Sequence, residues 1–340
     1  MHPYTDVLLE RGKRVADWLL SQIDNEGSLI HATDLYAYTK CVSALAMAGH
    51  PDKAALVLGQ IIKRFLTSDN DLMINEETGK KTCEPYTSFF SQTYANHWVI
   101  LGALKLGQIS TAHMLNSCIL ENFYDEEMGA MRTSRLPKLD RYDTTSAATG
   151  ILNFLGSRLD IAEKLGDFLI QVERSQPERE KIFYTNVEKP FTFVTQPDEK
   201  YPNFVGVKPN TPGQAVWMTG YPIAALSKLY EQTGKEKYLD GAKSYAKVYI
   251  NAGEPGFVSA GCGKALWGLS ILYRLTGDAK YDEVCRFILR NYFTQQAPDG
   301  SFPVPGFVPN DDMEGYSVIF DTTPENCRWF YEVAAELNGR

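Results

Sequence analysis

One ten-residue stretch of the sequence occurs twice and constrains the fold more than any other feature. Residues 229–238 read LYEQTGKEKY and residues 272–281 read LYRLTGDAKY, 43 positions further on. Each copy is predicted to end an apolar helix at a glycine, Gly234 or Gly277, where a positive φ is favourable, and to start an amphipathic helix directly afterwards. A period of this length is typical of proteins that repeat one supersecondary unit.

The same helix–glycine–helix pattern extends over nearly the whole chain. In each pair the first helix is amphipathic and charged on one side, which is typical of an outer helix, and the second is rich in Ala, Gly and Leu and nearly uncharged, which is typical of a buried helix. The six predicted pairs are 7–23 with 33–48, 53–66 with 88–106, 111–122 with 143–155, a helix from 160 with 214–232, 237–250 with 261–275, and 281–292 with 324–337.

Six alternations of outer and inner helices predict an all-α fold, an (α/α)6 toroid in which residues 1–340 form a single domain. An open superhelix of helix pairs is the alternative, but neither end of the chain has the polar capping repeat that such a superhelix needs. Connections from inner to outer helices are short, whereas those from outer to inner helices are long. The longest, residues 173–213, is rich in proline. We interpret it as a lid or wall over the pore, with a dimerisation arm of a homo-oligomer as the alternative.

Within this long segment, residues 182–184 and 191–194 are apolar and β-branched or aromatic enough to be strands. They are short and close together in the sequence. We therefore expect a β-hairpin there.

Charge and composition exclude several classes of partner. The net charge of −8 and the pI near 5.3 argue against binding to nucleic acid or to an anionic membrane surface, both of which require basic patches. The amino terminus lacks the pattern of a secretory signal, and the six cysteines are scattered through apolar segments, so we expect a reducing, cytoplasmic environment. His and Cys never occur at metal-ligand spacing, and neither a metal site nor another cofactor is predicted.

Two junctions between helices carry a resemblance to known enzymes. Residues 18–28 (WLLSQIDNEGS) and 293–302 (FTQQAPDGSF) share a turn of the type Asp-Gly-Ser, and together with Thr-Gly-Asp-x-Lys-Tyr this resembles the six-hairpin enzymes. The nearest in character are the unsaturated glucuronyl and rhamnogalacturonyl hydrolases, and a similar turn occurs in the toroids of terpenoid cyclases and protein prenyltransferases. The catalytic signatures of these families are absent. The resemblance therefore implies the fold and a central pore, and leaves the chemistry open.

In such a ring, the cavity is lined by the amino-terminal ends of the inner helices and the loops before them. Their unpaired N–H groups favour anionic or hydroxyl-rich ligands. The polar and aromatic residues predicted to bind substrate there are His31, Tyr36, Glu84, Tyr86, Gln92, Gln214, Trp217, Tyr221, Cys262 and Trp267. The aromatic members, with Tyr142, are suited to stack on sugar rings or to stabilise a carbocation, although each also fits a core position.

Two aspartates at the starts of inner helices are the leading candidates for acid–base catalysis. Asp143, in Arg-Tyr-Asp-Thr-Thr-Ser, and Asp34, in Ala-Thr-Asp-Leu-Tyr, would have raised pKa values if they were buried beside other acids and aromatic rings. Asp is also one of the best helix N-caps, and a purely structural role is the competing interpretation for both. For Asp321, followed by Pro324 at the expected first helical position, the cap interpretation is preferred.

Three further side chains are candidates for supporting roles. His97 lies on an otherwise apolar inner helix, where a buried histidine with a single polar neighbour is the commoner outcome, and Tyr142 adjoins Asp143. Cys262 precedes a helix whose amino terminus would lower the thiol pKa, although no base is adjacent in the sequence.

The sequence thus predicts a small-molecule enzyme in which Asp143 and Asp34 act as the acid–base pair, assisted by His97 or Tyr142. Hydrolysis of an unsaturated or ordinary glycoside is the first hypothesis, with epimerisation of a sugar or uronic acid close to it. A cyclase or isomerase acting on a natural-product or isoprenoid substrate is the second. A non-catalytic helical binding platform is the third.

Overall fold

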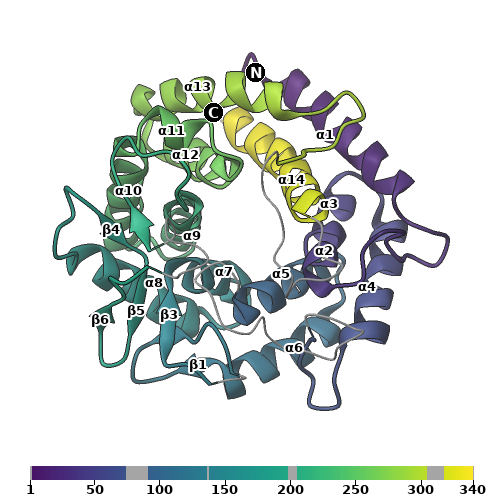
Figure 1. The fold of residues 1–340 in the computed structure, drawn as a ribbon, viewed down its shortest axis with the longest axis horizontal. Helices are drawn as coiled ribbons and strands as arrows, with labels where there is room; N and C mark the ends of the chain where they lie inside the picture. Colours follow the sequence, from purple (N-terminus) through teal and green to yellow (C-terminus); the bar gives the residue numbers. More distant parts are fainter. Residues whose placement is uncertain (1, 74–90, 136–137, 198–204, 305–317, 340) are drawn as a thin grey trace. The chain divides into compact units, whose positions relative to one another are not determined.

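The structure is a computed structural model that describes residues 2–73, 91–135, 138–197, 205–304 and 318–339. Helices dominate, and the strands are two or three residues long (Figure 1). By its internal packing, the chain divides into two compact units. The first comprises residues 1–86, 95–122 and 294–338, and the second comprises residues 87–94, 123–293 and 339–340. Each unit is described below by itself.

The first unit is built from both ends of the sequence. Its elements are α1 (Thr5–Ser21), α2 (Leu35–Tyr38), α3 (Cys41–Met47), α4 (Pro51–Phe65), most of α5 (Gln92–Lys105), α6 (Ile109–Asn122) and α14 (Val318–Asn338). Helix α14 packs against α1 on one side and against α2 and α3 on the other, and α3 also packs against α4 (Figure 1). The carboxyl-terminal helix therefore forms part of the core around the first two helix pairs.

The second unit contains the remaining helices. These are α7 (Thr144–Phe154), α8 (Leu159–Arg174), α9 (Trp217–Thr233), α10 (Glu236–Asn251), the single turn α11 (Glu254–Phe257), α12 (Cys262–Thr276) and most of α13 (Ala279–Gln295). Helix α9 packs against α7, α10 and α12 (Figure 1). In accordance with this position, residues 218–227 of α9 are buried on all sides, whereas α10 alternates buried and exposed residues as an outer helix should.

The alternation of outer and inner helices is as predicted, with shifts of a few residues at the ends. Two differences matter. The first inner helix is broken near Thr39 and Lys40 into α2 and α3, where a single helix over 33–48 was expected. The fourth inner helix begins at Trp217, so Gln214 precedes it. The second inner helix begins at Gln92 within the described residues, and residues 88–90 of the predicted range lie outside them.

The repeated ten-residue stretch has the same local structure in both copies. Gly234 and Gly277 have φ values of 67° and 74°, in the left-handed region that a Cβ atom disfavours, and their N–H groups bond the carbonyls of Tyr230 and Tyr273. The preceding threonine hydroxyls, of Thr233 and Thr276, each donate to the carbonyl four residues earlier at 2.7 Å. The repeat is therefore a helix C-cap, as predicted.

The strands gather in and around the 173–213 segment, but their pairing differs from the predicted hairpin. Strand β4 (Phe183–Tyr184) pairs with β7 (Gly206–Val207), and β6 (Thr192–Phe193) pairs with β5 (Asn186–Glu188), all antiparallel. Strand β5 also pairs with β3 (Arg141–Asp143), while β1 (Tyr124–Asp125) and β2 (Ala130–Met131) form a separate ribbon. Residues 191–194 thus form a hairpin with β5, whereas residues 182–184 pair with the more distant β7.

Within the part of the chain that the structure describes, every helix is too short or too polar to cross a membrane.

Candidate functional site

Asp34 is the amino-terminal cap of α2 in the first unit and is 2% exposed. Its Oδ1 atom accepts a hydrogen bond from the N–H of Tyr36 at 2.8 Å, while its Oδ2 atom is buried without a hydrogen-bond partner among the described residues. A cap needs only one carboxylate oxygen, so the second oxygen of Asp34 is available for a proton.

The protonation state of Asp34 differs from that of an ordinary aspartate. Burial raises the pKa of Asp34 to about 7. The backbone N–H groups of Tyr36 and Ala37 oppose this shift in part, and the charge of Asp321 adds to it. A substantial fraction of Asp34 therefore carries a proton at neutral pH. Such a carboxyl group can donate a proton as well as accept one.

A buried lysine joins two further acids near this position. The side chain of Lys40 is 2% exposed, and its Nζ atom lies 2.7 Å from Oδ1 of Asp321 and 3.2 Å from Oε2 of Glu325. The two acids are one turn apart on α14, and Asp321 is the more exposed of the two, at 17% of its side chain. We call Asp34, Lys40, Asp321 and Glu325 the acid cluster. It combines an aspartate whose pKa is raised to about 7 with two acidic side chains held by a buried lysine.

Asp321 was predicted to cap the sixth inner helix, and this prediction is wrong. Helix α14 begins at Val318, which places Pro324 inside the helix. The first turn is anchored by side chains: Thr322 Oγ1 donates to the carbonyls of Phe302 and Val318, and the N–H of Phe302 bonds Thr323 Oγ1 at 2.9 Å. These contacts hold the helix upstream of the proline, so the Asp321 carboxylate is left to pair with Lys40.

Of the other candidates in the first unit, His97 is fully buried, and burial lowers its pKa to about 3. It is therefore neutral at physiological pH. The neighbouring Asn96 donates from Nδ2 to Oδ1 of Asp71 at 3.0 Å.

Two predicted binding residues of the first unit differ in exposure: Tyr36 is buried and His31 is exposed. Glu84 and Tyr86 lie outside the described residues.

In the second unit, Asp143 caps α7 with both carboxylate oxygens. Oδ1 accepts the N–H of Ser146 at 2.6 Å, and Oδ2 accepts the hydroxyl of the same serine at 2.8 Å. The hydroxyl oxygen of Ser146 lies 2.7 Å from that of Ser91. Burial raises the pKa of Asp143, and the bonds from Ser146 oppose that shift. The cap interpretation of Asp143 thus has direct structural support, and its carboxylate is more fully bonded than that of Asp34.

Tyr142 is fully buried beside Asp143, and its hydroxyl donates to Oδ2 of Asp125 at 2.7 Å. The guanidinium of Arg132 pairs with the same carboxylate, and Lys189 lies 3.4 Å from it. Burial and the bond to Asp125 both raise the pKa of Tyr142. This network joins β1, β3 and the segment after β5, so the tyrosine hydroxyl has a structural partner.

The aromatic candidates of the second unit gather around one lysine. Lys264 Nζ lies 5.3 Å from the ring centroid of Tyr221 and 6.0 Å from that of Trp217, within the range of cation–π attraction. The hydroxyl of Tyr221 lies 3.0 Å from that of Tyr94. Lys264 is buried, as is Trp267 one turn further along α12. The Lys264 ammonium group therefore lies against the rings of Tyr221 and Trp217 inside the second unit.

Two predicted binding residues hold loops instead of presenting free polar atoms. The amide of Gln214 accepts from the N–H of Lys208 at 2.5 Å and donates to the carbonyls of Lys208 and Thr211. The side-chain oxygen of Gln92 accepts a hydrogen bond from the backbone N–H of Arg135 at 3.4 Å. The backbone N–H of Gln92 donates to the carbonyl of Thr133.

The expectation that Cys262 has a lowered pKa is wrong. The residue is at the first position of α12 but is fully buried, and burial raises its pKa to about 12. Desolvation of the thiolate outweighs the helix terminus and the nearby Lys264, so Cys262 is a neutral thiol.

Within the described ranges, no group of three or more His, Cys, Asp or Glu side chains is arranged to hold a metal ion. The sequence did not lead us to Lys40 as a site residue, nor to Asp321 as its ion-pair partner. A signal was present: Lys40 is a lysine in an inner-helix segment that is otherwise nearly uncharged, which indicates a buried ion pair.

Comparison with known proteins gives the fold class. No protein-family model and no curated protein matches the sequence. Among solved structures, a D-mannose isomerase matches with a TM-score of 0.71, 14% identity, and coverage of 98% of both chains. Cellobiose 2-epimerase from Bacillus thermoamylovorans matches with a TM-score of 0.68, 11% identity, and coverage of 97% of this chain and 99% of the other.

A third structure is an alpha-1,6-mannanase from Salegentibacter sp., an inactive variant with two aspartates replaced by alanine, in complex with alpha-1,6-mannotetrose. It matches with a TM-score of 0.64, 15% identity, and coverage of 97% of this chain and 99% of the other. These neighbours are (α/α)6 toroids, and the likeness extends over nearly the full length of each chain. The predicted all-α toroid class is therefore confirmed.

Proposed function

We propose that the protein is a carbohydrate-active enzyme that hydrolyses a glycosidic bond by carboxyl acid–base chemistry at the acid cluster. The observation that supports this most strongly is the contrast between Asp34 and Asp321. Asp34 is buried with a pKa of about 7, whereas Asp321 lies 2.7 Å from the buried ammonium group of Lys40 and is more exposed. Glycoside hydrolysis uses two carboxyl groups, one that donates a proton to the leaving oxygen and one that acts on the other face of the sugar.

In this proposal, Asp34 is the general acid. Its Oδ2 proton passes to the glycosidic oxygen as the bond to the anomeric carbon breaks, so the leaving sugar departs as a neutral alcohol. Asp321 is the partner carboxylate, which accepts a proton from the attacking water as it adds to the anomeric carbon. Lys40 and Glu325 are positioning residues, since they hold Asp321 in place through the shared ion pair.

The substrate class is proposed from the structural neighbours. The mannanase and the two sugar isomerising enzymes act on neutral sugars, by the names of those proteins. A neutral hexose or a short oligosaccharide is therefore the first substrate to test, with uronic-acid sugars next.

Isomerisation or epimerisation of a free sugar is the second candidate. It is favoured by the larger TM-scores of the mannose isomerase and the cellobiose epimerase, 0.71 and 0.68, against 0.64 for the mannanase. A group with a pKa near 7, such as Asp34, also suits the proton transfers of these reactions. Asp143, His97 and Tyr142 keep their predicted catalytic roles only as alternatives, because Asp143 and Tyr142 are bonded within the fold and His97 is buried and neutral.

The test is a substrate screen of the purified protein against alpha-1,6-mannobiose, nitrophenyl hexosides, unsaturated uronyl disaccharides, free mannose and cellobiose. Products are identified by NMR, which separates hydrolysis from isomerisation. Asp34→Asn and Asp321→Asn are compared with Asp17→Asn, an exposed aspartate on α1 of the same unit. Hydrolysis that is lost in the first two variants and retained in the third supports the proposal. Hydrolysis that persists in both cluster variants contradicts it.

A further inference from the structure

One buried hydroxyl group connects three parts of the first unit. Tyr38 is the last residue of α2 and is fully buried. Its phenol oxygen accepts hydrogen bonds from the backbone N–H of Leu29 at 2.9 Å and from Nη1 of Arg64 on α4. The same hydroxyl donates to the carbonyl of Ala32 at 3.4 Å. Burial raises the pKa of Tyr38, so the phenol keeps the proton that this last bond needs.

The segment that Tyr38 holds, residues 29–33, leads directly into Asp34, the cap of α2. Leu29 and Ala32 are buried, whereas the two residues between them are exposed. The segment is therefore part of the surface of the unit, and Tyr38 attaches it from the inside. Because the backbone of a cap residue continues the segment before it, this attachment fixes how deeply the Asp34 side chain lies.

Helix α4 holds this region at two points. Nε2 of Gln60 donates to the carbonyl of Glu26 at 3.0 Å. One turn further along, the guanidinium of Arg64 lies 5.2 Å from the ring centroid of Tyr38 and 5.3 Å from that of Phe65, within the range of cation–π attraction. Arg64 is thus fixed over two rings as well as by its hydrogen bond, and it joins the phenol to a regular helix of the unit.

The charged groups around α2 leave burial as the main influence on Asp34. Asp321 on α14 adds to the raised pKa of Asp34, and Lys40 lies against both Asp321 and Glu325. From α4, Arg64 reaches the carboxyl-terminal end of α2, away from the cap. Burial is the largest cause of the raised pKa, so contacts that hold the backbone before Asp34 in place control its protonation.

We propose that Tyr38, held by Arg64, is a positioning residue for Asp34, because its hydroxyl fixes residues 29–33 against α2 and so keeps water away from the Asp34 carboxyl group. This inference rests on the proposed function, in which Asp34 is the general acid. Without the hydroxyl, the segment loses an attachment at each of its two buried residues. Water then reaches Asp34, and its carboxyl group releases the proton at a lower pH.

The test compares the wild type with Tyr38→Phe, which keeps the ring and removes the hydroxyl. The pKa of Asp34 is measured by carbon-13 NMR of the carboxyl groups of the full chain, with Asp34→Asn to assign the signal. We expect this pKa to fall from about 7 to about 6. The amide proton of Leu29 should exchange about tenfold faster, because it loses its acceptor.

The same change has a kinetic consequence. A decrease in the pKa of Asp34 from about 7 to about 6 lowers its protonated fraction at pH 7 from about one half to about one tenth, so kcat at pH 7 should fall about fivefold. The pH above which kcat decreases should shift by the same amount as the pKa. KM should stay unchanged, because Tyr38 is buried and acts through Asp34.

Arg64→Met is a second variant on the same bond, at a partly exposed position. It keeps an apolar side chain over the two rings and removes one donor to the phenol. The pKa of Asp34 should therefore fall in the same direction but by less. Arg64→Lys keeps a charged donor and should restore the wild-type value. If Tyr38→Phe does not fold, these two variants decide the question by themselves.

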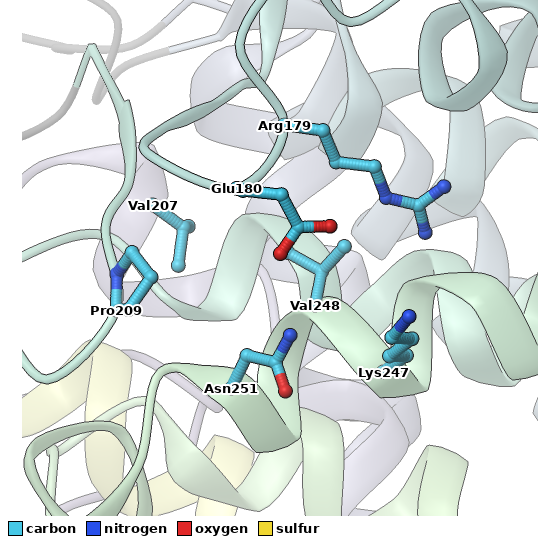
Figure 2. Close-up of a pocket in the computed structure, with 7 residues that line it drawn as sticks. All are labelled: Arg179, Glu180, Val207, Pro209, Lys247, Val248 and Asn251. Carbon is cyan, nitrogen blue, oxygen red and sulfur yellow. The ribbon is translucent and has the colours of Figure 1, made fainter.

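Tyr249→Phe is the matched control in the second unit. Tyr249 lies on α10 next to Val248 and two residues before Asn251, which both line the small hollow shown in Figure 2. Like Tyr38 it is fully buried, and its hydroxyl donates to the carbonyl of Gly256 at 3.0 Å. Its loss should lower the stability of the protein and leave the pKa of Asp34 unchanged.

The outcomes separate this inference from the hydrolytic function. A pKa of Asp34 that is about 7 in the wild type and unchanged in Tyr38→Phe and Arg64→Met overturns the role of Tyr38 alone. An equal shift in Tyr249→Phe overturns it as well, because the effect would then reflect a general loss of stability. An ordinary pKa of 3.8 for Asp34 in the wild type overturns both proposals. A lowered pKa in the two variants, with no hydrolysis by the wild type, supports the role of Tyr38 and contradicts the hydrolytic function.

Discussion

The Nζ atom of Lys40 lies 2.7 Å from Oδ1 of Asp321, which joins the break between α2 and α3 to the first turn of α14. Glu325 completes the ion pair from one turn further along the same helix. Asp34 caps α2 six residues before the lysine, and the charge of Asp321 contributes to its raised pKa. The acid cluster is thus assembled from the two ends of the sequence, within one compact unit.

Replacement of Lys40 by methionine removes the ammonium group that lies within 4 Å of both Asp321 and Glu325. Two largely buried acidic side chains then lose the cation that they share, and we expect a loss of about 3–5 kcal/mol in the free energy of unfolding, measured by urea denaturation. Lys13→Met is the control, because Lys13 is 72% exposed in its ion pair with Asp17, and it should change the stability little. Equal effects of the two substitutions would contradict the assignment of Lys40.

The raised pKa of Asp34 predicts a dependence of stability on pH. The folded protein keeps the proton up to about pH 7, whereas an unfolded aspartate releases it near its ordinary pKa of 3.8. The unfolded state is therefore favoured progressively as the pH rises from 4 to 7, and the contribution of Asp34 to stability falls by about 4 kcal/mol over that range. The Asp34→Asn variant lacks this pH-dependent contribution, because an amide does not titrate, and its side-chain oxygen can still cap α2.

The measurement is the unfolding free energy of the wild type and of Asp34→Asn at pH 4.5 and pH 8. The wild type should lose stability relative to the variant between the two values. Parallel changes in the two proteins would show that Asp34 titrates normally.

Tyr142→Phe separates a structural from a catalytic role for this tyrosine. Its hydroxyl bonds the Asp125 carboxylate, so its removal should lower the unfolding free energy by about 1.5–3 kcal/mol. Turnover of the substrate found in the screen should be unchanged if the proposed function is correct. A large loss of turnover with unchanged stability would instead support the catalytic role predicted from the sequence.

Buried thiols predict slow chemical labelling. Cys41, Cys118, Cys262, Cys285 and Cys327 are all buried, and burial raises the pKa of Cys262 to about 12. In a Cys83→Ser background, which removes the cysteine that lies outside the described residues, a disulfide reagent at pH 8 should label none of them until the protein unfolds. Rapid labelling of one thiol, located by mass spectrometry, would identify an accessible site that contradicts this account.

The fold was predictable because its signals are local. The six helix pairs follow from hydrophobic periodicity. The helix ends at Gly234 and Gly277 were predictable because the residue after a helix often adopts a positive φ, which glycine does without strain. A hairpin forms in the 173–213 segment, but its first strand is β5; the expected first strand, β4, pairs with the more distant β7, which no local pattern gives.

The site was predictable only in part. Asp34 was identified from its position before an inner helix, but its pKa depends on burial and on Asp321, which no local pattern gives. Asp321 itself was assigned to a cap because Asp and Pro at that spacing are typical of one. The contacts of Thr322 and Thr323 with Phe302 outweigh that preference. At Cys262, the local signal of a helix start was outweighed by burial.

The central claim is tested most directly by the pH dependence of kcat for the substrate found in the screen, in the wild type and in Asp34→Asn. If Asp34 is the general acid, kcat in the wild type should fall above about pH 7, the pKa to which burial raises Asp34. Asp34→Asn should lower kcat by about 10²- to 10⁴-fold and abolish the decrease in kcat above pH 7. Its circular dichroism spectrum should match that of the wild type. A folded Asp34→Asn variant with wild-type kcat and an unaltered profile would contradict the account.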